Sequence, residues 1–260
     1  MTDDRSDEAP RTLKTVGMAS NVLDAVKARD GIGVSDLAAE LDISKSTAYI
    51  HLRTLTENGF LVQEDERYRI SFKFTLFGEY ARKRSPLYRH GKSKVDELAD
   101  ETNLYTHIVT EENGLGINLY QVQGDTSVDG EYQSEKVQRR DNLHYTASGK
   151  AILAHLPREE VEAIVDQHGL PARTENTITD RDKLFDVLER IRDQGYAYND
   201  EEEIDGFRAI GAPVQDPSGR VLGSLSVSGP ASFMQGERYH DQLPDRVTRS
   251  ANVVEVNINM

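Results

Sequence analysis

The segment SKSTAYIHLR, residues 44–53, combines short hydroxyl side chains with basic ones that could contact a polyanion. Hydroxyls and free backbone N–H groups in the first turn of a helix can bind phosphate oxygens, and longer side chains further along can reach base edges. Such a surface is typical of a helix that reads double-stranded DNA in the major groove. The residues expected to make these contacts are Ser44, Lys45, Ser46, Thr47, Tyr49, Ile50 and Arg53.

A second segment, LHYTASGKAILAHL at residues 143–156, invites comparison with a phosphate-binding loop because it contains Gly149-Lys150. That interpretation fails, since no glycine lies five residues before Gly149, and Ala151 occupies the place where serine or threonine would bind magnesium. A loop that enters a helix remains, and its backbone N–H groups could bind a carboxylate. A purely structural glycine turn is an equally good interpretation.

Residues typical of catalysis or metal binding are either missing or dispersed. The chain has no cysteine, and its 7 histidines are scattered. The acidic run NDEEEIDG at 199–206 has no accompanying histidine or regular ligand spacing, which favours a solvated acidic turn over a metal site. No Ser-His-Asp order with a nucleophile elbow is present. We therefore expect no metal site, no cofactor and no enzymatic activity.

Short amphipathic helices are the elements that must position residues 44–53. Apolar residues recur at helical spacing over 15–29, where the expected core-facing set is Val16, Ala19, Val22, Leu23 and Val26. A second helix is expected with Ser35 as its N-cap, and a third with Ser44 as its N-cap. In the third helix Ala48, Leu52 and Leu55 form the core-facing stripe, which leaves the contact residues named above on other faces.

Two short strands, 61–63 and 67–72, are expected around the polar turn EDE. A hairpin directly after a third helix is a wing, and Arg67 and Arg69 flank its tip, where they could contact phosphates or the minor groove. A helical hairpin that merely packs is the alternative. The wing favours a winged helix-turn-helix that binds DNA.

The rest of the chain indicates a second domain. We expect a flexible tail at 1–10, the DNA-binding domain at 11–73, a helical linker at 74–92 interrupted at Ser85-Pro86, and a second domain at 93–260. From residue 104 apolar residues alternate with a period of two around a turn at Asn113-Gly114. Helical and strand patterns then follow without βαβ alternation, so the predicted fold class is α+β.

The formal net charge of -14 conflicts with DNA binding unless the acidic residues lie elsewhere. Residues 1–90 contain 14 acidic and 14 basic side chains, whereas residues 91–260 contain 31 acidic and 17 basic ones. This excess is similar to that of proteins from salt-accumulating halophiles, and an ordinary acidic bacterial protein is the alternative. With no leader-like segment and no apolar run long enough for a membrane span, we expect a cytoplasmic protein.

Two segments carry a resemblance to a known family. LHYTASGKAILAHLP at 143–157 and GYAYNDEEEIDGFRAIGAPVQDPSGRVLGSLSVSGP at 195–230 resemble signatures of the IclR family of transcriptional regulators. The resemblance implies a GAF-like effector-binding domain, an antiparallel or mixed sheet flanked by helices, that binds a small organic acid. Carried over by motif position, the effector-binding residues are Ala147, Ser148, Asn199, Ala209, Ser226 and Ser228.

Two of these positions depart from the family pattern. Asn199 stands where many members have aspartate, and Ala209 where many have cysteine, which implies a less acidic and slightly larger pocket. Ser226 and Ser228 are two apart on an expected strand and therefore share a face.

The expected function is a DNA-binding regulator whose operator binding responds to an organic acid or sugar-derived metabolite. The resemblance also implies a homodimer or a dimer of dimers that reads an inverted repeat. Two alternatives stay open: a metabolite-binding or enzymatic C-terminal domain with an incidental DNA module, and an architectural DNA binder with a vestigial pocket. In a salt-rich cell counterion release contributes little, so DNA binding is expected to depend weakly on salt.

Overall fold

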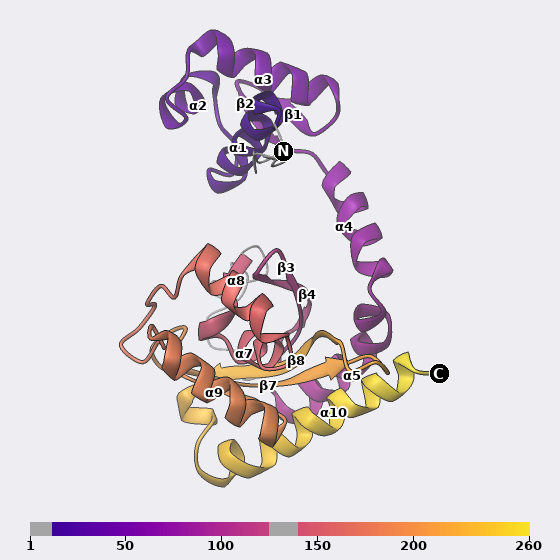
Figure 1. Ribbon diagram of the computed structural model, residues 1–260. Coiled ribbons are helices and arrows are strands. Elements are labelled where there is room, and N and C mark those ends of the chain that lie inside the picture. Colours follow the sequence, from indigo (N-terminus) through magenta and orange to yellow (C-terminus); the bar gives the residue numbers. More distant parts are fainter. Residues whose placement is uncertain (1–11, 125–139) are drawn as a thin grey trace, which may run out of the picture. The chain divides into compact units, whose positions relative to one another are not determined.

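The computed structural model describes residues 12–124 and 140–260. The chain divides into two compact units, Met1–Ala81 and Arg82–Met260, which Figure 1 draws with their elements labelled. The expected tail at 1–10 lies outside the described residues. Within the described ranges, no helix combines the length and apolarity needed to cross a bilayer.

The first unit is built around helices and one hairpin. In chain order its described elements are α1 (Lys14–Ala28), α2 (Val34–Glu40), α3 (Lys45–Glu57), β1 (Leu61–Glu64), β2 (Arg67–Ile70) and α4 (Lys73–Arg84), the last of which continues into the second unit. β1 and β2 pair antiparallel, and Asp65 takes a φ of 54° in the turn between them. A bridge between Ile32 and Tyr68 joins this hairpin to the loop before α2. The elements have the order of a winged helix-turn-helix.

The sequence of α3 explains both its start and its orientation. The Ser44 hydroxyl accepts a hydrogen bond from the Thr47 N–H at 3.0 Å, which satisfies one of the free donors of the first turn. Ala48, Leu52 and Leu55 are buried in the core of this unit. Both observations confirm the sequence-based expectation for this helix, and the polar face of α3 is therefore the exposed one.

Two local expectations for this unit are wrong. α2 begins at Val34 with Gly33 as its N-cap, so Ser35 lies inside the first turn and caps nothing. The chain is held extended at Gly33, directly after the Ile32–Tyr68 bridge, and the helix starts as soon as this pairing ends. Val16 is 65% exposed, because burial along α1 begins only at Val22.

The second unit contains a single sheet and the helices that cover it. Its described elements are α5 (Pro86–Thr102), β3 (Tyr105–Glu112), β4 (Leu115–Val122), β5 (Arg140–Asn142), η1 (Leu143–Tyr145), α7 (Ala147–Leu153), α8 (Arg158–His168), α9 (Arg181–Gln194), β6 (Ala197–Asp200), β7 (Phe207–Gln215), β8 (Val221–Pro230), η2 (Ala231–Phe233), η3 (Arg238–Gln242) and α10 (Leu243–Ile258). Ser85 caps α5 by accepting from the Tyr88 N–H, and α5 runs unbroken across the expected domain boundary at 92 and 93.

The sheet is antiparallel throughout its described strands, in the order β5-β4-β3-β8-β7-β6. Asn113 and Gly114 join β3 to β4 with φ values of 55° and 79°, as a tight hairpin turn requires. The α+β fold class expected from the sequence is thereby confirmed, with an antiparallel rather than a mixed sheet.

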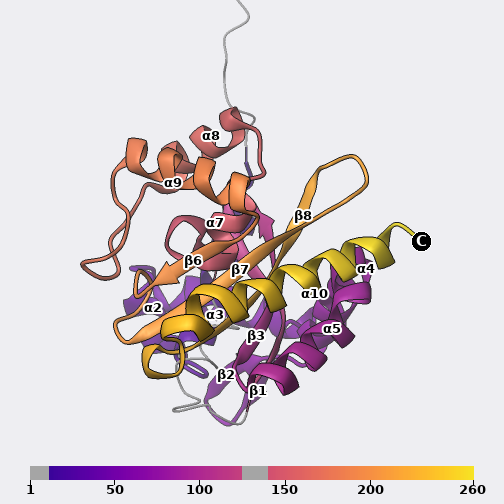
Figure 2. The ribbon, with the colours of Figure 1, turned by 90° about the horizontal axis from the view of Figure 1, so that it is seen from below.

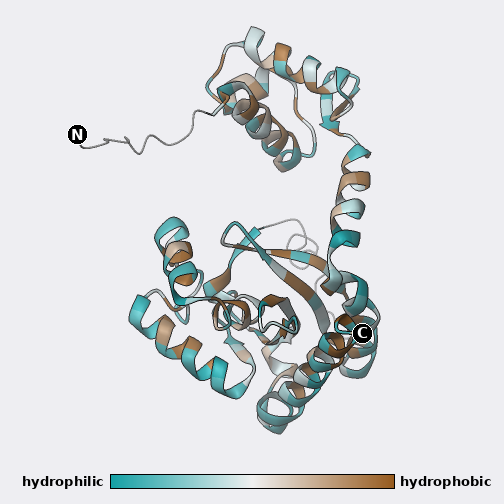
Figure 3. Ribbon diagram, turned by 45° about the vertical axis from the view of Figure 1, so that its right-hand side comes forward, coloured by the Kyte–Doolittle hydropathy of each residue, from teal (hydrophilic) through white to brown (hydrophobic). Residues whose placement is uncertain are grey.

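Helices cover both faces of this sheet (Figure 2). One face packs against α5 and α10, where Leu98, Ile108 and Leu225 belong to one buried cluster. On the other face a second cluster contains Ala151 of α7 and Leu188 of α9. In Figure 3 these helices carry both brown and teal residues, as expected for helices that bury one side. The two faces differ in polarity, because the strand residues beneath α7 include serine and histidine.

Glycine allows α7 to approach the sheet and η1 closely. A Cβ atom at Gly149 would lie 2.1 Å from the Leu143 carbonyl oxygen, and one at Gly211 on β7 would lie 2.8 Å from the Ala147 carbonyl carbon. Both are backbone contacts that a rotamer change cannot relieve. Gly149 is therefore required by packing, whereas the sequence alone allowed either a packing or a binding role.

We expect Gly149→Ala to destabilise the second unit by about 3 kcal/mol, the range in which overpacking of a rigid site falls. Gly17→Ala is the matched control, because Gly17 lies within α1 and a Cβ there meets nothing within 4 Å. Alanine should stabilise that helix by up to about 1 kcal/mol. Denaturant titration of both variants measures the change in the free energy of unfolding. Equal stability of the two variants would show that η1 can move to accommodate the added methyl group.

Candidate DNA-binding surface and effector site

The exposed face of α3 carries most of the residues predicted to contact DNA. Tyr49 is 46% and Ile50 61% exposed, unusual values for large apolar side chains on a helix that is otherwise well packed. Lys45, Ser46 and Arg53 are exposed as well. The face therefore offers hydroxyl, aromatic, apolar and basic groups together, the mixture that reads base edges and phosphates.

Three members of the set predicted on α3 have structural partners. The Ser44 hydroxyl bonds to that of half-buried Thr47 at 2.8 Å, so these two residues shape the helix start. Arg53 Nε lies 2.8 Å from Glu57 Oε1, and this hydrogen bond, with the charge of Glu57, raises the pKa of the guanidinium. Because both side chains are exposed, water screens the pair, and Arg53 can exchange Glu57 for a phosphate.

The wing arginines are directed toward their own unit. Arg67 donates a hydrogen bond to the Gly31 carbonyl oxygen. Arg69 forms ion pairs of 3.0 Å with both Asp30 and Glu64. These contacts hold the wing against the loop after α1. Contact of Arg67 and Arg69 with DNA remains a prediction.

The strand register brings the predicted effector residues onto one face of the sheet. Asn199 on β6 pairs with Ala209 on β7, which pairs with Ser228 on β8. Ser226 shares that face, and Ser148 on α7 donates a hydrogen bond to it at 2.7 Å. All of these residues and Ala147 are buried. The long-range pairing thus gathers residues that are up to 81 positions apart, between 147 and 228.

A small cavity of about 30 Å³ lies between α7 and this face. Its lining residues are His107, Val109, Gly116, Asn118, Asp141, Thr146, Ser148 and Ser226. Two of the six predicted effector residues therefore line it. Asn199 instead accepts a hydrogen bond from the Glu202 N–H at 2.8 Å and stabilises the turn after β6.

His107 and Asn118 were not anticipated from the sequence. His107 on β3 is 2% exposed, pairs in register with Ser226, and lies 2.9 Å from the Ser228 hydroxyl through Nε2. Asn118 on β4 lies 3.3 Å from His107 Nδ1. Alternation within 105–111 does place His107 on one face of a strand, but no local signal shows that β3 pairs with β8.

A buried ion pair joins α7 to the turn after β6. Lys150 of α7 contacts Glu202 Oε1, and both residues are buried. Burial lowers the pKa of Lys150 and raises that of Glu202, and their mutual attraction opposes both shifts. The expectation of a solvated acidic turn at 199–206 is wrong for Glu202 and Glu203, which are 7% and 6% exposed. The pair fixes α7 to the turn after β6.

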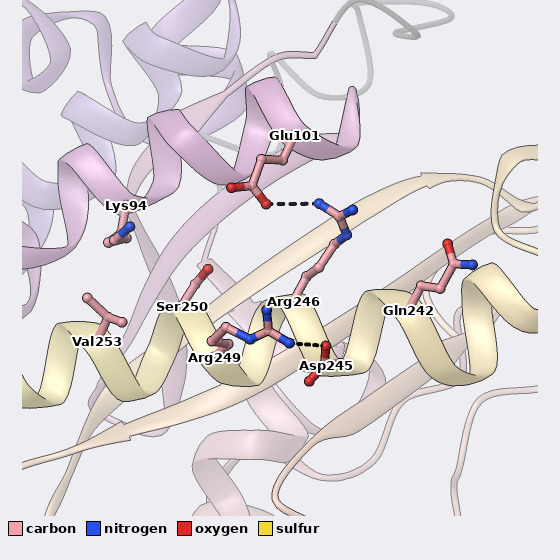
Figure 4. A pocket seen from close by; sticks show the side chains of 8 residues that line it. All are labelled: Lys94, Glu101, Gln242, Asp245, Arg246, Arg249, Ser250 and Val253. Atoms are coloured by element: carbon pink, nitrogen blue, oxygen red, sulfur yellow. Dashed lines mark hydrogen bonds and ion pairs between the residues drawn. The ribbon is translucent and has the colours of Figure 1, made fainter.

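A larger groove of about 350 Å³ runs between α5 and α10 (Figure 4). Arg246 forms an ion pair with Glu101 at 2.9 Å, and Arg249 forms one with Asp245. Its arginine charges are therefore compensated within the groove. The cavity beneath α7 has the buried polar lining expected of a metabolite site. Among the described residues, no group of three His, Cys, Asp or Glu side chains could hold a metal ion.

Comparison with known proteins gives matches along nearly the whole chain. The family model described as "Bacterial transcriptional regulator IclR C-terminal" matches residues 81–256, and the "IclR helix-turn-helix domain" model matches residues 16–65. The chain is 36% identical over 250 residues to the "Probable HTH-type transcriptional regulator ArcR" of Halobacterium salinarum, covering 96% of this chain and 95% of that protein.

Solved structures of similar proteins have the same fold. The crystal structure of the Thermotoga maritima IclR superimposes with a TM-score of 0.75 at 28% identity and covers 96% of this chain and 100% of that one. An IclR homolog from Microbacterium hydrocarbonoxydans, solved in complex with 4-hydroxybenzoate, gives a TM-score of 0.79 at 19% identity, covering 94% and 98%. At that identity the second match supports the fold alone.

Proposed function

The chain belongs to the IclR family of DNA-binding transcriptional regulators, and we propose from this premise that a small carboxylate bound beneath α7 controls its binding to an operator. The family has an effector-binding C-terminal domain and is not known to be enzymatic. The observation that carries the proposal is the cavity between α7 and the sheet, lined by Ser148 and Ser226.

The DNA contact is assigned to the exposed face of α3. Lys45 and Arg53 would neutralise phosphates, while Ser46, Tyr49 and Ile50 would approach base edges in the major groove. The wing would lie over the adjacent backbone. Arg67 and Arg69 would first have to leave Gly31, Asp30 and Glu64, so we expect them to contribute less than α3 does.

The effector is assigned to the face formed by Ser226, Ser228 and α7. A carboxylate accepts hydrogen bonds, and the serine hydroxyls can donate them. One protein of the same fold has been solved in complex with 4-hydroxybenzoate, which is a carboxylate. The linker at 74–92 would carry the response, because α5 packs on the sheet and continues through Ser85 to α4.

A homodimer accounts for the exposed apolar side chains of α4. Leu76, Phe77 and Tyr80 are 73%, 52% and 72% exposed, and α4 has no buried residue. Exposed apolar groups in this density mark protein interfaces. We expect Leu76→Glu with Tyr80→Glu to convert a dimer to a monomer in sedimentation experiments. A wild-type mass that is already monomeric would contradict this.

We expect a shallow dependence of operator affinity on salt. If Lys45 and Arg53 of each protomer supply the phosphate contacts, a dimer neutralises about four phosphates, and log K should fall with log salt with a slope of roughly −4. Titration of the dissociation constant between low and high KCl measures this slope. A slope near −10 would show that many more basic groups reach the phosphates.

A mobility shift on DNA from upstream of the protein's own gene tests the proposed function. Specific operators are bound roughly 10³-fold or more tightly than unrelated DNA. An architectural binder would retard upstream and shuffled DNA equally. Turnover of any bound acid would instead support the enzymatic alternative.

A further inference from the structure

The hydrogen bonds around His107 have a defined direction. The Asn118 side-chain nitrogen can only donate, so His107 Nδ1 is the acceptor in their 3.3 Å contact. The imidazole proton is then on Nε2, which donates to the Ser228 hydroxyl at 2.9 Å. Ser228 keeps its own hydroxyl hydrogen for another acceptor.

Ser226 likewise accepts one hydrogen bond and keeps its own hydroxyl hydrogen. It accepts a hydrogen bond from Ser148 at 2.7 Å, which leaves its own hydroxyl hydrogen available. Ser226 and Ser228 lie on the same face of β8. Ser226, which lines the cavity, and its strand neighbour Ser228 therefore each have a hydroxyl hydrogen to donate, which suits the two oxygens of a carboxylate.

Asn118 and Asp141, which also line the cavity, offer hydrogen-bond acceptors. Asn118 Oδ1 is buried and has no hydrogen-bond partner among the described residues, whereas its nitrogen contacts His107 and Gln121 Oε1. The carboxylate of Asp141, whose Oδ1 accepts from the Tyr145 hydroxyl at 3.3 Å, lines the same cavity. A buried acceptor without a donor is costly, and a ligand that supplies one removes that cost.

We propose that the effector is a carboxylate with a hydrogen-bond donor, a hydroxyl or an ammonium group, on a nearby carbon, and that Asn118 recognises this donor. The inference rests on the proposed function and narrows its ligand class. Acids that only accept hydrogen bonds, such as simple alkanoates, leave Asn118 Oδ1 without a partner and bind more weakly.

The cavity between α7 and the sheet is too small for a metabolite as it stands. The cavity volume of about 30 Å³ is far below the roughly 300 Å³ or more of an ordinary small-molecule site, so the site has to widen to admit a metabolite. In the proposed binding mode α7 moves away from β8 and the hydrogen bond between Ser148 and Ser226 breaks. The effector replaces this bond at its carboxylate end, so recognition and the displacement of α7 occur together.

The test uses two sets of three acids, and the acids of each set share one carbon skeleton. Dissociation constants of the full chain are measured by calorimetry in high KCl for L-lactate, L-alanine and propionate, and then for phenyllactate, phenylalanine and 3-phenylpropionate. We expect the lactate or the alanine member to bind at least about tenfold more tightly than the unsubstituted acid. Which of the two it is distinguishes a hydroxyl from an ammonium donor.

Variants assign the preference to Asn118. Asn118→Leu should reduce the preference to less than about threefold by weakening only the substituted acids. Ser226→Ala should weaken all three acids together and keep the preference. Asn252→Leu, at an exposed position of α10, is the matched control and should change neither.

Equal affinity for all three members of both sets overturns the inference and leaves the proposed function intact. A preference that survives in Asn118→Leu also overturns it, since the donor is then recognised elsewhere. If no acid of either set binds, the carboxylate effector and the inference fall together.

Discussion

Replacing Lys45 and Arg53 together by alanine should weaken binding to the upstream operator by at least about 30-fold. The estimate follows from the loss of two basic contacts to phosphates or bases, each worth about 1–3 kcal/mol. Both side chains are exposed on α3 and outside the core formed by Ala48, Leu52 and Leu55, so the fold should be unchanged. Fluorescence anisotropy with labelled operator, at the salt concentration where the wild type binds, measures the loss.

The control removes the same amount of charge from the second unit. Arg158 and Arg181 are exposed on α8 and α9 and form surface ion pairs with Glu162 and Asp166. Their double alanine variant should bind the operator within about twofold of the wild type, because exposed pairs of this kind contribute little. Comparable losses in both double variants would indicate a general charge effect and contradict the assigned reading face.

Lys150→Met should destabilise the second unit by about 3–5 kcal/mol. The substitution leaves Glu202 buried without its counter-charge, and removing one partner of a buried ion pair has a cost of that size. The burial that already raises the pKa of Glu202 then acts without the opposing charge of Lys150. A carboxyl whose pKa is raised by folding loses stability as the pH rises, so the defect should shrink toward low pH.

The double variant Lys150→Met with Glu202→Leu should recover most of the loss, because an apolar pair can replace a buried ion pair at little cost. Arg158→Met at the exposed pair with Glu162 is the surface control and should cost less than about 0.5 kcal/mol. Denaturant titrations of the wild type, Lys150→Met, Glu202→Leu and the double variant give the coupling free energy, with Arg158→Met measured beside them. A double variant as unstable as Lys150→Met would show that the pair itself, and not the isolated charge, stabilises α7.

Local patterns in the sequence were sufficient to predict where α3 begins and which of its residues are buried. The spacing of Ala48, Leu52 and Leu55 and the cap at Ser44 depend on neighbours within one helix, and the structure confirms them. The hairpin at Asn113-Gly114 was equally predictable, because these residues favour the positive φ that a two-residue turn needs. Ser35 failed as a cap because the bridge between Ile32 and Tyr68, a contact between distant residues, decides where α2 begins.

The residues around the cavity beneath α7 could not be predicted in the same way, because contacts between residues far apart in the sequence bring them together. His107 reaches Ser228 across 121 positions, and Lys150 reaches Glu202 across 52. An acidic run normally indicates a solvated turn, but here one buried lysine reverses that expectation for Glu202. Only the resemblance to a known family directed attention to Ser148 and Ser226, and it gave no indication of Asn118.

The central claim is that a small carboxylate bound by this chain changes its affinity for an operator. A single titration tests this claim most directly. The dissociation constant of the full protein for its own upstream DNA is measured without ligand and with the acid that binds most tightly. We expect a change of at least about fivefold, the lower end of ordinary allosteric coupling, while shuffled DNA stays unaffected. The same affinity with and without the bound acid, or equal affinity for shuffled DNA, would contradict the account.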